Sequence, residues 1–258
     1  MDQPIFTTTR VLLLTLVCLV LMGDATATTA IALRSRHRVV LAADSRAVYG
    51  ATRDASECKL FQYGGIYATV AGLAHYGTSY RATDALRDGY ARPGDFRAHV
   101  SATAYSLQHR VQGLLAGIQR SNPSEYQTIM QRTATPSDFV ALAITEMVAG
   151  DPMLGVIELQ HAAGRPDLAV KITICPGNCR QDGGIFYLGY WEQIRPYVAN
   201  AGQERSVGSA ASIDRLIRLE IKAHPAEVGA PIDILELNRS GARWLQNGGN
   251  CSLPGVGW

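Results

Sequence analysis

The chain has 258 residues, of which 47% are hydrophobic and 18% charged, and its formal net charge is +2. This composition is typical of a globular protein with a full core and excludes a disordered chain. The small net charge and the lack of any run of Lys or Arg argue against nucleic acid as a partner.

The beginning of the chain has the form of a secretory signal peptide. Arg10 precedes an apolar run at 11–22, and the Ala-Thr-Ala sequence ending at Ala27 has the small-x-small form of a cleavage site. The apolar run is shorter than the roughly 20 residues that a membrane-spanning helix needs. We therefore expect a signal peptide at 1–27 and a secreted or periplasmic protein, free of the membrane, that begins at Thr28. An uncleaved anchor is the alternative.

A threonine at the start of a chain has unusual chemistry. It carries a hydroxyl and a free α-amine on the same residue, and the amine has an intrinsic pKa of about 7.7–8.0. Such an amine can take the hydroxyl proton without help from a histidine. Cleavage after Ala27 would therefore make Thr28 a nucleophile that carries its own base.

The first half of the mature chain is predicted to contain two hairpins followed by two helices. Asp95 is in the position of an N-cap for the second helix. These elements span Thr29 to Leu33, Val39 to Asp44, Lys59 to Tyr63, Ile66 to Ala71, Leu73 to Tyr90 and Phe96 to Ser121. The polar stretch from Ser124 to Ser137 has no clear assignment.

The second half repeats this order and closes with a hairpin. Its predicted elements span Phe139 to Val148, Leu154 to Leu159, Ala169 to Ile174, Ile185 to Leu188, Trp191 to Asn200, Ser206 to Ala223, Pro231 to Leu237 and Ala242 to Leu245. Strands and helices in this order predict an α+β fold, with antiparallel sheets between two outer layers of helices. We expect one domain over 28–258, built as a four-layer α/β/β/α sandwich.

The cysteines of the mature chain favour disulfides over metal binding. Export would place four of them in an oxidising compartment, where an even number permits pairing. Cys175 and Cys179 can close a small loop around a turn, whereas the pairing of Cys58 and Cys251 stays open. No second cysteine pair or well-spaced histidine accompanies Cys175 and Cys179, and we expect neither a metal nor a cofactor.

Four short segments carry a resemblance to a known family. They are Thr28-Thr29-Ala-Ile-Ala-Leu, Val39-Val-Leu-Ala-Ala-Asp44-Ser45-Arg46, Lys59-Leu-Phe and Ala71-Gly72, with a weaker fifth at Gly229-Ala-Pro-Ile-Asp-Ile-Leu. They resemble the signature segments of proteasome β-type subunits, which are N-terminal nucleophile (Ntn) hydrolases. The resemblance implies the four-layer fold of that superfamily.

The resemblance also implies a role for each matched residue. Thr28 would be the nucleophile, and Lys59 would lie beside its hydroxyl as a cation held by Asp44. The backbone N–H of Gly72 would stabilise the oxyanion of the reaction intermediate. Val70 would line the specificity pocket and favour a modest apolar side chain in the substrate.

Three positions depart from the family pattern. Ala27 stands where the family has a glycine before the nucleophile. Tyr190 occupies the place of a serine near the active threonine, and Pro225 that of a second aspartate, with Glu227 close by as a substitute. These departures bear on catalytic turnover more than on the fold.

The sequence therefore predicts an exported threonine-type peptidase or amidohydrolase that acts on a peptide through an acyl-enzyme on Thr28. Two alternatives remain. One is an Ntn acylase acting on small amides, and the other is a catalytically inactive proteasome-like binding or scaffold protein. The family's ring assemblies imply a homo-oligomer.

Overall fold

The computed structural model describes residues 28–49, 52–132, 139–161, 168–179, 184–201, 208–248 and 251. The signal peptide expected at 1–27 and its cleavage site lie outside the described residues. Within these ranges, no helix has both the length and the apolar character of a membrane span.

The first sheet has five antiparallel strands. In spatial order they are β12 (Gly184–Gly189), β1 (Thr29–Ser35), β2 (Arg38–Asp44), β13 (Ile232–Asn238) and β14 (Gly241–Gln246). The strands β1 and β2 form the predicted first hairpin, in a register that pairs Ala30 with Ala43. Because of this register, the start of β1 lies beside the end of β2.

The second sheet also has five antiparallel strands. They are β11 (Leu168–Cys175), β10 (Asp151–His161), β9 (Val140–Val148), β6 (Ile66–Gly72) and β5 (Leu60–Tyr63). Two small hairpins accompany the sheets, formed by β3 (Arg46–Tyr49) with β4 (Thr52–Ser56) and by β7 (His75–Tyr76) with β8 (Tyr80–Arg81).

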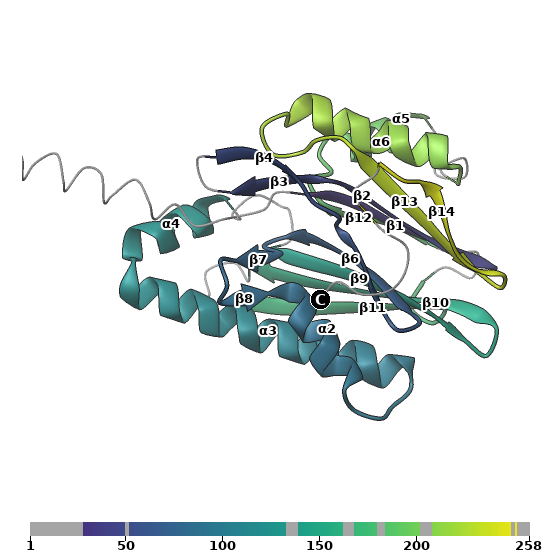
Figure 1. Cartoon of the computed structure of the whole chain (residues 1–258), viewed down its shortest axis with the longest axis horizontal. Coiled ribbons are helices and arrows are strands. Elements are labelled where there is room, and N and C mark those ends of the chain that lie inside the picture. The colour runs from purple at the N-terminus through teal and green to yellow at the C-terminus, as the bar shows by residue number, and fades with distance from the viewer. Residues whose placement is uncertain are drawn as a thin grey trace, which may run out of the picture.

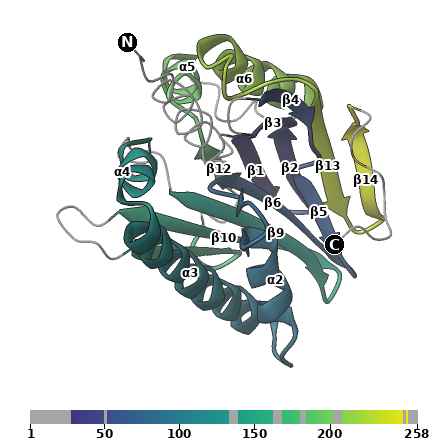
Figure 2. The same cartoon turned by 60° about the vertical axis from the view of Figure 1, so that its left-hand side comes forward.

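Helices cover the outer face of each sheet (Figures 1 and 2). The first sheet is covered by α5 (Ile194–Ala201) and α6 (Ala210–Ala223), and the second by α2 (Ala82–Tyr90) and α3 (Phe96–Ser121), which is followed by α4 (Pro123–Arg132). The architecture is the predicted α+β fold with four α/β/β/α layers.

Alternating side chains on β1 explain how the layers hold together. Ala30 and Ala32 point into the core between the two sheets, whereas Ile31 and Leu33 pack against α5 and α6. Small residues let the sheets approach closely, and large aliphatic residues fill the space under the helices. Burial of each large aliphatic side chain contributes about 1.5–3 kcal/mol.

The helix predicted from Leu73 to Tyr90 is wrong over its first half. Only α2 is helical, and β7 and β8 precede it around Gly77, which has a φ of +50°. The Tyr80 hydroxyl donates to the Leu73 carbonyl across this hairpin at 3.2 Å. A local hydrogen bond of a buried tyrosine thus stabilises a hairpin where the apolar spacing also fits a helix.

Other elements agree with the sequence or were missed by it. Asp95 caps α3, as predicted, by accepting a hydrogen bond from the Ala98 N–H at 2.8 Å. The β3–β4 hairpin was not predicted, and α4 lies in the stretch that had no assignment.

Candidate active site

Thr28 lies directly before β1, and its side chain is buried. Its carbonyl oxygen accepts a hydrogen bond from the Tyr190 N–H at 3.1 Å. Among the described residues, Thr28 Oγ1 has no hydrogen-bond partner. A buried unpaired hydroxyl costs about 1–3 kcal/mol. Such an atom calls for an explanation, and a catalytic role is one of the few available.

The end of β12 holds the backbone of Thr28 and Thr29 in place. The Thr29 hydroxyl donates to the Tyr190 carbonyl at 3.1 Å, and Thr29 pairs with Gly189 in the sheet. Gly189 has a φ of +73°, and a Cβ placed on it would overlap the Thr28 carbonyl oxygen. A glycine is therefore required there, both for its conformation and for the close approach of the backbone.

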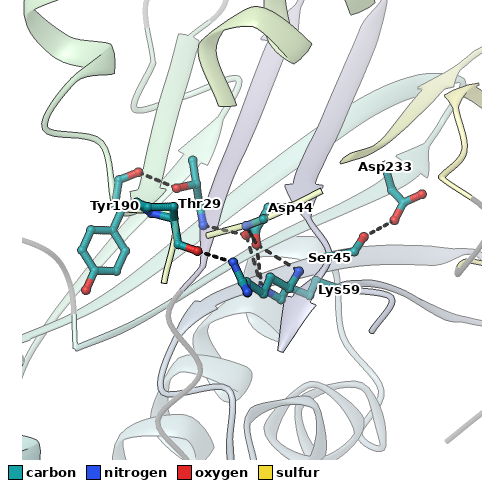
Figure 3. Close-up of polar contacts among 9 residues, drawn as sticks. Thr29, Asp44, Ser45, Lys59, Tyr190 and Asp233 are labelled. Atoms are coloured by element: carbon teal, nitrogen blue, oxygen red, sulfur yellow. Dashed lines mark hydrogen bonds and ion pairs between the residues drawn. The ribbon is translucent and has the colours of Figure 1, made fainter. Parts of the chain in front are cut away.

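Asp44 collects hydrogen bonds at the end of β2 (Figure 3). Its Oδ1 accepts from the Thr29 N–H at 2.9 Å, and its Oδ2 accepts from the N–H groups of Arg46 and Gly229, both at 3.1 Å. Lys59 Nζ lies 3.2 Å from each of the two oxygens. The structure therefore brings together the predicted acid and lysine, next to the residue that follows Thr28.

Burial shifts the pKa values of both Lys59 and Asp44. It lowers the pKa of Lys59, against the attraction of Asp44, and it raises the pKa of Asp44, against the attraction of Lys59 and the N–H donors. A buried amine with a lowered pKa can exchange a proton closer to neutral pH than a solvated lysine can. The pair thus holds the Thr29 N–H, directly after Thr28, and places a titratable amine beside it.

A second buried acid, Asp233 on β13, supports this corner of the site. The Ser45 hydroxyl donates to Asp233 Oδ2 at 2.6 Å, and the Gly248 N–H donates to Oδ1 at 2.7 Å. Figure 3 shows Ser45 reaching away from the Asp44–Lys59 pair toward Asp233. The sequence did not single out Asp233 as a site residue, although it lies in the Gly229-Ala-Pro-Ile-Asp-Ile-Leu segment.

Gly72 and Val70 lie at the end of β6 and differ in their surroundings. Gly72 has a φ of +80°, which favours glycine, and its neighbour Ala71 lies close to Gly189. The end of β6 is therefore near the start of β1. Val70 is 1% exposed and packs in the core between the second sheet and its helices.

Two of the positions that depart from the family pattern, Tyr190 and Pro225, lie near one another, whereas Ala27 is outside the described residues. The Tyr190 ring packs against the His224 ring with centroids 4.5 Å apart, and Figure 3 shows it pointing away from Asp44. The carbonyl of Pro225, the next residue after His224, accepts a hydrogen bond from the Arg46 guanidinium. The Glu227 N–H donates to the His224 carbonyl at 3.0 Å.

The described part of the chain contains two disulfides. Cys175 is bonded to Cys179, and Cys58 is bonded to Cys251. The second bond settles the pairing that the sequence left open. It ties the chain near its end to the residue directly before Lys59.

Comparisons with known proteins identify the fold. No family model matches the chain, and no curated protein is similar to it in sequence. Two solved structures of Anbu from Hyphomicrobium sp. strain MC1 are similar in fold. A mutant form has a TM-score of 0.52 and 14% identity over 85% of each chain. The other structure has a TM-score of 0.51 and 13% identity over 84% of this chain and 85% of that one. The chain therefore shares its fold with Anbu, in agreement with the four-layer sandwich expected from the sequence.

Proposed function

We propose that the mature protein begins at Thr28 and is an exported threonine-type amidohydrolase that cleaves peptide bonds. One observation carries this proposal. Thr28 Oγ1 is buried and has no hydrogen-bond partner in the described part of the chain, while Tyr190 holds the carbonyl of the same residue. The next N–H along the chain, that of Thr29, is held by Asp44. The proposed nucleophilic atom is thus unpaired within the described residues, while the backbone around it is held in place.

The reaction follows from the groups on Thr28. Its α-amine takes the Oγ proton, and Oγ forms an ester bond with the carbonyl carbon of the substrate amide. The C–N bond then breaks, and the leaving amine takes the proton. A water molecule hydrolyses the ester and restores the hydroxyl. Gly72 would donate its N–H to the oxyanion, a contribution of roughly 3–4 kcal/mol in comparable sites.

Lys59 and Asp44 would serve this chemistry by electrostatics. A cation near the N-terminus favours the neutral form of the α-amine, which is the form that accepts a proton. Asp44 keeps the lysine in place and fixes the Thr29 N–H through the same carboxylate. Both groups would therefore position and tune the nucleophile without bonding to the substrate.

Export is the second element of the proposal. The two disulfides support export, because disulfides persist in an oxidising compartment whereas cytosolic thiols are kept reduced. Signal peptidase would then release the Thr28 amine, so that export and activation are one event.

Covalent labelling tests the proposal. N-terminal sequencing of the exported protein should give Thr-Thr-Ala-Ile, and an epoxyketone or β-lactone peptide should add one inhibitor mass to Thr28. Thr28→Ala should abolish the adduct. Thr29→Ala, which removes only the neighbouring hydroxyl, should keep it. A protein that begins elsewhere, or an adduct that persists in Thr28→Ala, would show the proposal to be wrong.

A catalytically inactive scaffold is the competing function, and it is favoured by Tyr190 and Pro225 at positions where the family carries polar groups. Failure of both reagent classes to label correctly processed protein would select it. If labelling succeeds, panels of peptides and small amides separate a peptidase from an acylase. A homo-oligomer is part of the proposal, and light scattering of the mature protein would measure it.

A further inference from the structure

A second polar cluster lies beside the Tyr190 ring, where the start of α5 meets the end of α6. It consists of Glu192, Glu220 and His224, and one ligand atom from each lies within 4.8 Å of the other two. His224 Nε2 is 3.8 Å from Glu192 Oε2 and 3.7 Å from Glu220 Oε2. These separations are too long for hydrogen bonds.

Two of the converging atoms are buried and unpaired. The Glu220 side chain is 0% exposed, and its Oε1 accepts from the N–H groups of Gln193 and Ile194 at 2.7 and 2.9 Å. Its Oε2 and His224 Nε2 have no hydrogen-bond partner among the residues that the structure describes. Such atoms are costly to bury without a partner, and here both point at one spot.

We propose that Glu192, Glu220 and His224 bind one divalent transition-metal ion, with Zn²⁺ as the ion that fits best. Two carboxylates balance the charge of the ion, and an imidazole selects zinc and its neighbours over Mg²⁺ and Ca²⁺. Bonds of about 2.0–2.2 Å in tetrahedral geometry place ligand atoms roughly 3.3–3.6 Å apart. The observed separations of 3.7 and 3.8 Å need to close by only a few tenths of an ångström.

Further contacts hold the three side chains in place. The two backbone N–H groups fix the Glu220 carboxylate, and the Trp191 N–H donates to Glu192 Oε2 at 3.2 Å. The Tyr190 ring, 4.5 Å from the His224 ring, fixes the imidazole. Partners of this kind orient ligands in protein metal sites.

The sequence alone could not have indicated this site. Glu220 and His224 have an i, i+4 spacing on a helix, which is common for surface residues, and Glu192 comes from a different element. The Tyr190 N–H bonds the Thr28 carbonyl and the Tyr190 ring packs on His224, so the ion would stabilise the segment that carries Tyr190.

Direct metal binding tests the proposal. Protein stripped with EDTA is titrated with Zn²⁺ by calorimetry and with Co²⁺ by visible absorption. We expect one equivalent of Zn²⁺, a raised melting temperature and the strong d–d bands of four-coordinate Co²⁺. Glu220→Gln keeps the Oε1 acceptor. The variant that combines Glu220→Gln with His224→Gln should bind Zn²⁺ at least about 100-fold more weakly. His109→Gln, on the exposed face of α3, is the matched control and should bind as the unchanged protein does.

Three results would overturn the proposal. They are no Zn²⁺ bound at millimolar concentration, equal affinity in Glu220→Gln and the unchanged protein, or an equal loss in His109→Gln. Far-UV circular dichroism shows whether each variant is folded, and Thr28→Ala should bind Zn²⁺ normally. Failure of this site is therefore distinguishable from failure of the proposed hydrolase activity.

Discussion

Lys59 Nζ lies 3.2 Å from each carboxylate oxygen of Asp44, and the two side chains are 7% and 0% exposed. The same carboxylate accepts the N–H of Thr29, one residue after Thr28. One buried acid therefore connects the lysine to the backbone beside Thr28. Because both charges are buried, removing either one should leave the other without its partner and destabilise the site.

A double-mutant cycle on this pair is the first prediction. Asp44→Asn or Lys59→Met alone leaves one charge buried without its partner, which typically costs 3–5 kcal/mol. The double variant should lose less than the sum of the single losses, by about 1–3 kcal/mol. Urea unfolding of the three variants measures this coupling.

The control for the cycle is an exposed ion pair. Arg87 lies 2.8 Å from Asp84 one turn away on α2, and Asp84→Asn should cost no more than about 1 kcal/mol. Strictly additive losses at Asp44 and Lys59 would contradict the coupling.

Gly189 carries the second prediction. A Cβ at this position would overlap the Thr28 carbonyl oxygen. The residue also has a φ of +73°, which a residue with a side chain rarely adopts. Gly189→Ala should therefore displace the Thr28 backbone, lower stability by more than about 2 kcal/mol and slow the labelling of Thr28 by an epoxyketone.

Gly64 separates the two causes of that loss. It has a φ of +58°, but a Cβ there would meet no atom within 4 Å. Gly64→Ala should cost only the conformational term of about 1–2 kcal/mol and leave the labelling rate unchanged. Equal losses of stability and labelling in the two variants would mean that contact with Thr28 is unimportant.

The parts of the site that the sequence predicted depend on local pairing. Thr28 and Asp44 come together because β1 and β2 form a hairpin, whose strands alternate and turn in a recognisable way. Lys59 was found because it lies in a segment that resembles a family signature. Short separations and a resemblance were thus enough for the Asp44–Lys59 pair.

The parts that the sequence missed depend on contacts between distant segments. Cys58 pairs with Cys251 across 193 residues, and Ser45 reaches Asp233 from a different strand. Neither partner of such a contact carries a local signal. The first half of the predicted 73–90 helix failed for a different reason, because a hairpin at this position has an apolar spacing that also fits a helix.

The two disulfides should differ in their effect on stability. In the chain-entropy model, a bond that closes a loop of 193 residues contributes about 5 kcal/mol, and one that closes a loop of 4 residues contributes about 2 kcal/mol. Replacing Cys58 and Cys251 by serine should therefore destabilise the protein more than replacing Cys175 and Cys179. Guanidinium unfolding of the two paired variants measures the difference. A larger loss from the Cys175–Cys179 variant would contradict it.

Glu236 should make stability depend on pH in the acid range. It is buried on β13, and burial alone would raise the pKa of its carboxyl, but hydrogen bonds from Arg38, Arg243 and Asn238 outweigh burial and hold the pKa below its usual 4.5. A folded-state pKa below the unfolded one gives stability that is present above about pH 4.5 and is lost as the pH falls through the lower value.

Glu236→Gln should be less stable than the unchanged protein at neutral pH, by about 1–3 kcal/mol. Calorimetric melting temperatures of the two proteins should then converge as the pH falls below the lowered folded-state pKa of Glu236, where the carboxyl is protonated in both the folded and the unfolded states. A gap of constant size across this range would mean that the Glu236 charge does not stabilise the fold.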